Sequence, residues 1–222
     1  AAATACGRDL RQRTIYFRLM TQRVLLIALA LVWLSACSSG PSAPDDADYA
    51  DRLAAARIAK DQQFREASDS PVPKEKRDAL LPLPYFPVDP AFTVPAALKL
   101  SGDRPVFEMP TSTGALRKMQ LVGTLEFTFE GERRSLGAFV EDGTQQITNL
   151  FVPFADLTTG MDTYAAGRYL DIEPTTTGYY TIDFNRAYNP YCAYNATYEC
   201  PFPPPSNRLN VAIRAGEKAP GA

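Results

Sequence analysis

Apolar and polar residues alternate along the second half of the chain. Between Leu121 and Glu130 the odd positions are apolar or glycine and the even positions are mostly polar, and the alternation returns over Ser135–Val140. A period of two on both sides of Gly131 predicts a β-hairpin with one apolar face, which carries Leu121 together with Leu125. Turn residues separate four further predicted strands, at 145–152, 168–172, 179–184 and 209–213.

A helical spacing of apolar residues occurs once, ahead of these strands. The segment Asp45–Ala67 is rich in alanine, and the prolines in Ser68–Pro73 end its helical pattern. The apolar stripe, formed by Tyr49, Leu53 and Phe64, is thin, so we expect the helix to dock lightly. The fold class is therefore predicted to be mainly β (α+β), an antiparallel β-sandwich or a partly closed β-barrel with an N-terminal helix.

The segment Leu80–Pro95 holds five prolines among large apolar residues. That density disfavours both a helix and a central strand. Two interpretations are open. We favour an extended arm whose aromatic and aliphatic side chains are buried against the edge of the core; the alternative is an exposed proline motif that docks on a partner.

Residues 20–37 have the layout of a lipoprotein signal peptide. A basic region at Met20 and Arg23 precedes the unbroken apolar run Val24–Leu34. Small residues then lead into Cys37, where such a signal is cut and the cysteine receives lipid. The alternatives are a transmembrane helix or a buried helix. A transmembrane helix is disfavoured because eleven apolar residues span only about half of a roughly 30 Å hydrocarbon core.

The domain organisation follows from this signal. We expect residues 1–19 to be upstream translation that the native protein lacks. The expected parts are then a signal peptide at 20–36, a lipidated tether at 37–44, an N-terminal helix and linker at 45–79, and a β domain at 80–222. The protein is thus predicted to be exported and anchored to the bacterial membrane by lipid on Cys37, on the periplasmic face if the cell has an outer membrane.

Composition narrows the classes of function. Without the signal, 186 residues remain, with 18 Lys and Arg against 24 Asp and Glu, a net charge of −6. A surface of this sign gives no electrostatic basis for binding nucleic acid. Histidine is absent from the sequence, which excludes His-based triads, His general bases and His metal ligands. We expect no metal and no cofactor.

Cys192 and Cys200 remain as a pair in the exported domain. Such a pair outside the cytoplasm favours a disulfide, and closing this short loop would stabilise the domain by about 2.5 kcal/mol. Two alternatives stay open. A zinc site would need two further ligands, and a redox pair would more usually have the spacing Cys-x-x-Cys.

Four segments in the second half carry a family resemblance. They read GRYLD at 167–171, DFNRAYNPYCAY at 183–194, CPFPPPSNRL at 200–209 and AGE at 215–217. In this order they resemble the bacterial and archaeal domain of unknown function 1684, and the resemblance covers roughly residues 60–218. Because that family is uncharacterised, the resemblance implies no activity.

A pocket for a polar ligand is the main functional hypothesis. Its candidate residues combine a guanidinium, carboxylates, amides and a phenol near strand ends: Arg168, Asp171, Asp183, Asn185, Tyr188 and Asn189. The structural alternative, which we favour, pairs Arg168 with Asp171 or Asp183 and uses the asparagines as turn caps. The stretch Asp156–Asp162 also alternates oxygen-bearing side chains, but it lacks the closing carboxylate of a Ca²⁺ loop, so we expect local Asx and Ser/Thr turns there.

These observations favour a non-catalytic module of the cell envelope that binds a small polar ligand or an envelope protein. No catalytic residue is assigned. The alternative is a carboxylate-dependent hydrolase that uses a polar pocket around Arg168 and Asp183.

Overall fold

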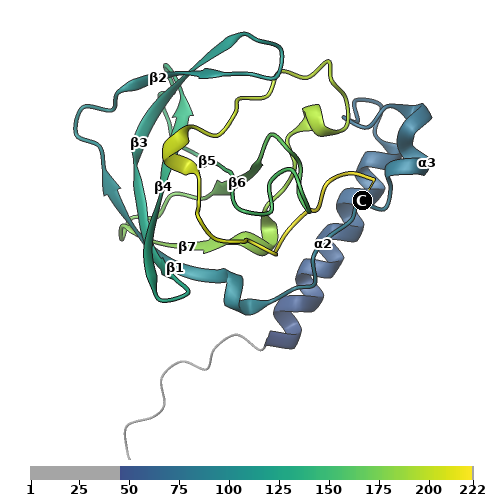
Figure 1. The fold of residues 1–222 in the computed structure, drawn as a ribbon, viewed down its shortest axis with the longest axis horizontal. Helices are drawn as coiled ribbons and strands as arrows, with labels where there is room; N and C mark the ends of the chain where they lie inside the picture. The colour runs from purple at the N-terminus through teal and green to yellow at the C-terminus, as the bar shows by residue number, and fades with distance from the viewer. Residues whose placement is uncertain (1–45, 222) are drawn as a thin grey trace, which may run out of the picture. The chain divides into compact units, whose positions relative to one another are not determined.

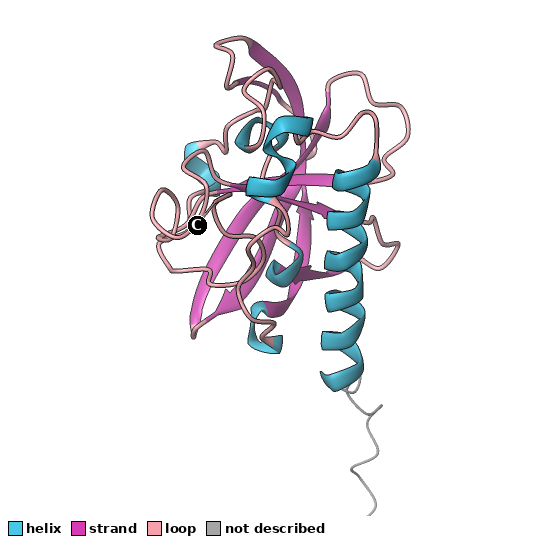
Figure 2. Ribbon diagram, turned by 90° about the vertical axis from the view of Figure 1, so that its right-hand side faces the viewer, coloured by secondary structure: helices cyan, strands magenta, loops and turns pink. Residues whose placement is uncertain are grey.

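The structure is a computed structural model that describes residues 46–221. The predicted upstream segment, the signal peptide and the tether with Cys37 lie outside the described residues. No helix within the described part is long and apolar enough to cross a membrane. Residues 46–221 form an N-terminal helix and a curled antiparallel sheet, as Figure 1 and Figure 2 show.

Seven strands form the sheet, and each pairs with its neighbours in the antiparallel direction. They are β1 (Thr93–Leu100), β2 (Val106–Pro110), β3 (Leu116–Phe129), β4 (Glu132–Glu141), β5 (Leu150–Phe154), β6 (Arg168–Ile172) and β7 (Tyr179–Asp183). Their order is β6-β5-β4-β3-β1-β7, with β2 also paired to β3. The sheet curls into a half-barrel (Figure 1), which confirms the predicted fold class in its partly closed form.

The predicted hairpin is formed by β3 and β4. Glu130 and Gly131 both have positive φ, at 51° and 77°, as a two-residue turn that matches the strand twist requires. One detail of the prediction is wrong, because the register shifts just after Leu121 and a bulge turns the following side chains to the other face. Leu121 packs with Met119 on one face, whereas Leu125 lies in the main core on the other.

The main core fills one face of the sheet. Its members come from every strand except β2 and from the C-terminal segment. The predicted strand at 209–213 is not formed, although Leu209, Val211 and Ile213 are buried in this core as alternation predicts. Its backbone bonds to the loop after β5, with Leu209 donating to the carbonyl of Ala155 at 2.8 Å, so no continuous strand ladder extends it.

The sequence pattern did not predict β1 and β2. β1 lies between β3 and β7 and contains Pro95, which contradicts the expectation that the proline-rich segment excludes a central strand. Pro95 faces Thr181 of β7, and pairing with β3 begins only at Ala96. The proline therefore sits where β1 is paired on one side only, the position at which a strand tolerates it.

The rest of the proline-rich segment is the packed arm that we favoured. Leu81, Leu83 and Phe86 are buried, and the amide of Phe86 donates to the carbonyl of Gly216 at 2.9 Å. Short helices frame this arm and the C-terminal segment: η2 (Lys74–Lys76), α3 (Arg77–Leu80), η3 (Pro90–Phe92), η4 (Phe184–Arg186), η5 (Tyr191–Ala193) and η6 (Pro205–Asn207).

The long helix α2 (Asp46–Glu66) stands beside the sheet (Figure 2). Its apolar stripe is as thin as predicted, because Leu53 and Phe64 are its buried apolar residues within the described part. Polar contacts add to this packing, among them the ion pair between Lys60 and the buried Glu217, at 2.5 Å. One side of α2 forms part of the wall of a cavity.

Candidate functional site

A cavity lies on the face of the sheet opposite the main core. Alternate residues of β5 and β6 point to opposite faces, so Phe151, Tyr169 and Asp171 face away from the core. α2 and the segment Tyr188–Pro201 lie across from them, and together they line an open cavity of about 900 Å³. This segment is held on β6 by backbone hydrogen bonds of 2.9 and 3.0 Å between Tyr169 and Tyr188.

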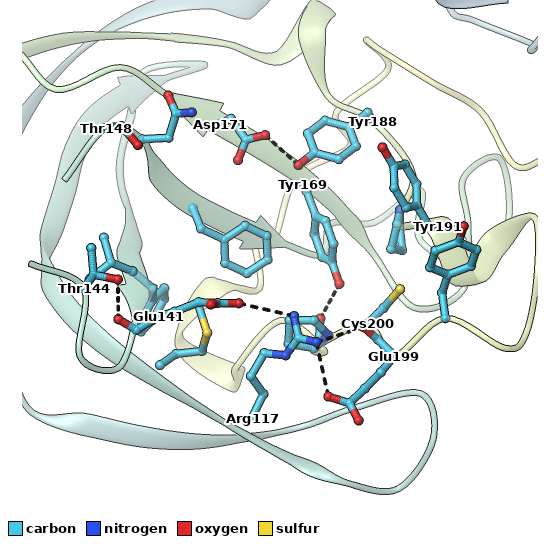
Figure 3. Close-up of a pocket in the computed structure, with 18 of the residues that line it drawn as sticks. Arg117, Glu141, Thr144, Thr148, Tyr169, Asp171, Tyr188, Tyr191, Glu199 and Cys200 are labelled. Atoms are coloured by element: carbon cyan, nitrogen blue, oxygen red, sulfur yellow. Dashed lines mark hydrogen bonds and ion pairs between the residues drawn. The ribbon is translucent and has the colours of Figure 1, made fainter. Parts of the chain in front are cut away.

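Aromatic rings line much of this cavity (Figure 3). They come from α2, β4, β5, β6 and the segment that follows β7: Phe64, Phe139, Phe151, Tyr169, Tyr188, Tyr191 and Tyr198. Tyr169 packs edge to face against both Phe151, with ring centroids 4.7 Å apart, and Tyr188, at 5.8 Å. Edge-to-face packing holds the rings in one arrangement, so the aromatic wall is preformed.

Charged side chains at the cavity wall are arranged as ion pairs. Arg117 on β3 lies between two carboxylates, 3.6 Å from Glu141 and 3.2 Å from Glu199, as Figure 3 shows. The ammonium of Lys60 pairs with the buried Glu217. Both cations of the cavity wall are thus already neutralised by carboxylates of this domain.

Two tyrosines fix the geometry of the inner wall. The Tyr188 hydroxyl donates to Oδ2 of Asp171 at 2.7 Å, and the Tyr169 hydroxyl donates to the carbonyl of Pro201 at 2.6 Å. Burial raises the pKa of both phenols, and the carboxylate of Asp171 raises the pKa of Tyr188 further. Both hydroxyls therefore stay protonated and act as donors.

Arg168, the central residue of the predicted pocket, does not face this cavity. It is fully buried on the core side of β6 and pairs with Asp156 at 2.9 Å. Its guanidinium also donates to three carbonyls of the C-terminal segment, those of Ala215, Glu217 and Ile213. The predicted structural ion pair is therefore present, but its partner is Asp156 rather than Asp171 or Asp183.

The two candidate asparagines are likewise buried among backbone groups. Asn185 exchanges two hydrogen bonds with the backbone of Asp89, at 3.0 and 2.9 Å. The side chain of Asn189 donates to the carbonyl of Lys218 at 2.7 Å. The backbone N–H of Asn189 donates to the carboxylate of Glu217 at 2.8 Å. The side chain of Asn185 thus joins η4 to the proline-rich arm, and that of Asn189 bonds to the C-terminal segment.

Asp183 and Asp171 line a second, smaller cavity of about 440 Å³ beside β6 and β7. Asp183 caps η4 and accepts hydrogen bonds from Tyr49, Thr93 and Asn185. Because Arg168 lies on the core side of the sheet and Asp183 at this rim, the pocket expected around Arg168 and Asp183 for a hydrolase is not formed within residues 46–221. Of the six candidates, Asp171 and Tyr188 alone line the larger cavity.

The loop Asp156–Asp162 contains the expected local turns. Oδ1 of Asp156 accepts from both the amide and the hydroxyl of Thr158, at 2.7 and 2.6 Å. Its other oxygen is occupied by Arg168, so the carboxylate serves the fold. Across the described residues, no three His, Cys, Asp or Glu side chains are grouped so that they could hold a metal ion.

Cys192 and Cys200 are buried, unbridged thiols that lie side by side. The amide of Cys192 is 3.1 Å from Sγ of Cys200. A hydrogen bond between the two thiols lowers the pKa of the Cys192 thiol to about 6. The same thiol–thiol bond raises the pKa of the Cys200 thiol. Cys200 also lines the larger cavity. Of the pair, Cys200 thus forms part of the cavity wall and Cys192 lies behind it.

The sequence pattern missed several residues of the cavity wall. Three of them are far apart in the chain, and no motif links them: Lys60 on α2, Arg117 on β3 and Glu199 in the segment Tyr188–Pro201. Tyr169 could have been found, because it alternates with the core residues of β6 and therefore shares a face with Asp171. The other residues meet only through the tertiary fold.

Fold and cavity together define a class: a curled, mainly antiparallel β domain with a preformed, aromatic-lined cavity beside an N-terminal helix. The family model described as protein of unknown function (DUF1684) matches residues 79–218. The chain therefore belongs to the DUF1684 family, which confirms the expected resemblance over those residues.

One solved structure extends this result. The solution NMR structure of an uncharacterized protein from Haloarcula marismortui is similar to this chain, with 40% sequence identity and a TM-score of 0.63. The match covers 78% of this chain and 96% of the other. No curated protein matches the chain significantly. The comparisons show a family and a fold, and they name no activity.

Proposed function

We propose that this domain is a non-catalytic binding module whose ligand site is the larger cavity. The observation that carries the proposal is the cavity itself. Its volume of about 900 Å³, lined by α2, the sheet and the Tyr188–Pro201 segment, is the size that binds a drug-sized ligand. Its wall combines packed aromatic rings with a few polar groups in defined positions, the usual composition of a ligand pocket.

The polar groups of the wall support binding rather than chemistry. Arg117 is held between two carboxylates, and Asp171 accepts from a phenol that stays protonated. Side chains held in this way present fixed hydrogen-bonding groups to a ligand. The arrangement orients a bound molecule and needs no proton transfer.

Filling the cavity tests this proposal. Ala59 lines the cavity from α2, so Ala59→Trp should place an indole in it, whereas Ala54→Trp puts the same ring at an exposed position of α2 outside it. We expect a thermal-shift screen of metabolites and glycans on the full chain to give hits that Ala59→Trp loses and Ala54→Trp keeps. Hits that survive Ala59→Trp would place the ligand site elsewhere and overturn the proposal.

We also propose that the protein is an exported lipoprotein held at the bacterial membrane through Cys37. The support is the order of basic, apolar and small residues that precede this cysteine in the sequence. Stable attachment by lipid requires more than one acyl chain, which lipoprotein processing supplies. The binding module would then act at the membrane surface on a small polar ligand or an envelope protein.

In the exported protein we propose a disulfide between Cys192 and Cys200. Their burial side by side supports it, as does the oxidising compartment that the signal implies. The bond would close the loop that forms one wall of the cavity. Peptide mass mapping of the unreduced protein checks it, and two freely alkylated thiols in protein taken from the envelope would refute it.

A further inference from the structure

The charges of the larger cavity limit which ligands it can take. Two cations, Lys60 and Arg117, are interleaved with three carboxylates, Glu141, Asp171 and Glu199. An anionic ligand would meet these carboxylates, and both cations already have partners in the domain. For a cationic ligand, Asp171 is the one carboxylate of this wall that has no cation beside it among the described residues, because Glu141 and Glu199 already pair with Arg117. The charges of the wall are thus largely matched within the domain, and an ion of either sign gains little net attraction from them.

Neutral hydrogen-bonding groups complete the wall. Gln146, Thr148 and Asn149, from the segment between β4 and β5, line the cavity, and their side chains make no hydrogen bond to any described residue. Asp171 is exposed, and Tyr188 occupies only one of its oxygens. These groups offer a ligand several acceptors and donors close to the aromatic wall formed by Phe151 and its neighbours.

The geometry points to a neutral, polyhydroxylated ligand, a sugar ring of a saccharide, as the molecule that this cavity binds. This inference rests on the proposed function. Hydroxyl groups would donate to the open oxygen of Asp171 and bond to the amides and hydroxyl between β4 and β5, while the apolar C–H face of the ring would pack on the aromatic side chains. A neutral ring needs no partner among the charges that are already paired.

The test titrates the full chain with three kinds of probe and follows the backbone amide signals of β5 and β6 by NMR. The probes are N-acetylglucosamine and glucose oligomers for neutral saccharides, spermidine for cations and inorganic phosphate for anions. We expect a neutral saccharide to shift these signals. Asp171→Asn should weaken its binding by about tenfold or more, because a hydrogen bond to a charged acceptor is lost.

Two further variants distinguish a specific role of Asp171 from a general effect of charge. Glu173→Gln removes an exposed carboxylate two residues away that lines only the smaller cavity, so it should leave saccharide affinity unchanged. Tyr188→Phe keeps the ring but removes the bond that orients Asp171, so it should weaken binding less than Asp171→Asn.

The outcomes separate this inference from the proposed function. If spermidine or phosphate, and no saccharide, shifts the cavity signals, the inference is wrong and the binding module stands. Saccharide binding that Asp171→Asn leaves intact also overturns the inference. If no probe shifts these signals, the saccharide inference fails, and the Ala59→Trp screen alone decides whether the cavity is a ligand site.

Discussion

At the scale of single residues, buried polar side chains join segments that are far apart in the chain. Arg168 ties β6 to Asp156 and to the C-terminal carbonyls. The side-chain oxygen of Asn207 accepts from the backbone N–H of Gly137, and its NH₂ group donates to the carbonyls of Gly137 and Pro153. Such groups are tolerated inside a protein because nearly every donor and acceptor has a partner. Removing one member leaves the other buried without its partner.

Arg168→Ala should therefore unfold the domain more easily rather than only weaken binding. It leaves the carboxylate of Asp156 buried without its cation, and breaking a buried pair on one side costs about 3–5 kcal/mol. Denaturant unfolding measures this loss. Arg186→Ala removes an exposed partner of Asp183 and should cost at most about 1 kcal/mol. A stable Arg168→Ala domain would disprove the structural role.

At the scale of elements, polar contacts position α2. Its apolar stripe is thin, yet Arg57 donates to the carbonyl of Phe86 at 3.1 Å and Tyr49 donates to Asp183 at 2.8 Å. Lys60 adds the pair with Glu217. Directional contacts of this kind fix the rotation and height of a helix more closely than a narrow apolar stripe does. The position of the cavity wall depends on them.

Glu217→Gln should loosen α2 while the sheet persists. The carboxylate of Glu217 accepts from Lys60, Tyr85, Asn189 and Tyr194, and an amide would turn its NH₂ group toward some of these donors. We expect a loss of about 3 kcal/mol, with amide hydrogen exchange rising more in α2 than in β3. Arg52→Gln breaks only an exposed pair with Asp48 within α2 and is the control. Equal protection of α2 in both variants would contradict this account.

At the scale of the whole molecule, the described domain contains the cavity, and the sequence before it is the basis of the proposed localisation at the membrane. The domain begins at residue 46, nine residues after Cys37. No helix in residues 46–221 is long and apolar enough to cross a bilayer. Attachment to the membrane is proposed to depend on lipid on Cys37.

Cys37→Ala should move the protein from the membrane fraction to the soluble fraction, since the acceptor of the lipid is lost. Fractionation of cells that express the full chain measures this shift. Ser38→Ala, next to the cysteine, should leave the distribution unchanged. Retention of Cys37→Ala in washed membranes would refute the lipid anchor.

Strand alternation explains how far the sequence could predict the fold. The β3–β4 hairpin, β6 and β7 follow from a period of two, and α2 follows from its helical spacing. β1 could not be found in this way, because Pro95 and its neighbours hide a strand that only its partners β3 and β7 support. The bulge after Leu121 could not be predicted from the sequence pattern either, since a one-residue shift in register depends on how two strands pair.

The candidate site shows the same division. The sequence by itself identified Asp171 and Tyr188 as polar residues near strand ends, and both line the cavity. It could not separate them from Arg168, which β6 turns toward the core. Local periodicity depends on neighbours along the chain, so the sequence by itself determined the β3–β4 hairpin, β6, β7 and α2. Its longer motifs determined the family, and the residues that precede Cys37 are the basis of the proposed membrane anchor. Which distant residues share a cavity depends on how the sheet curls and where α2 docks, and only the tertiary structure decided that.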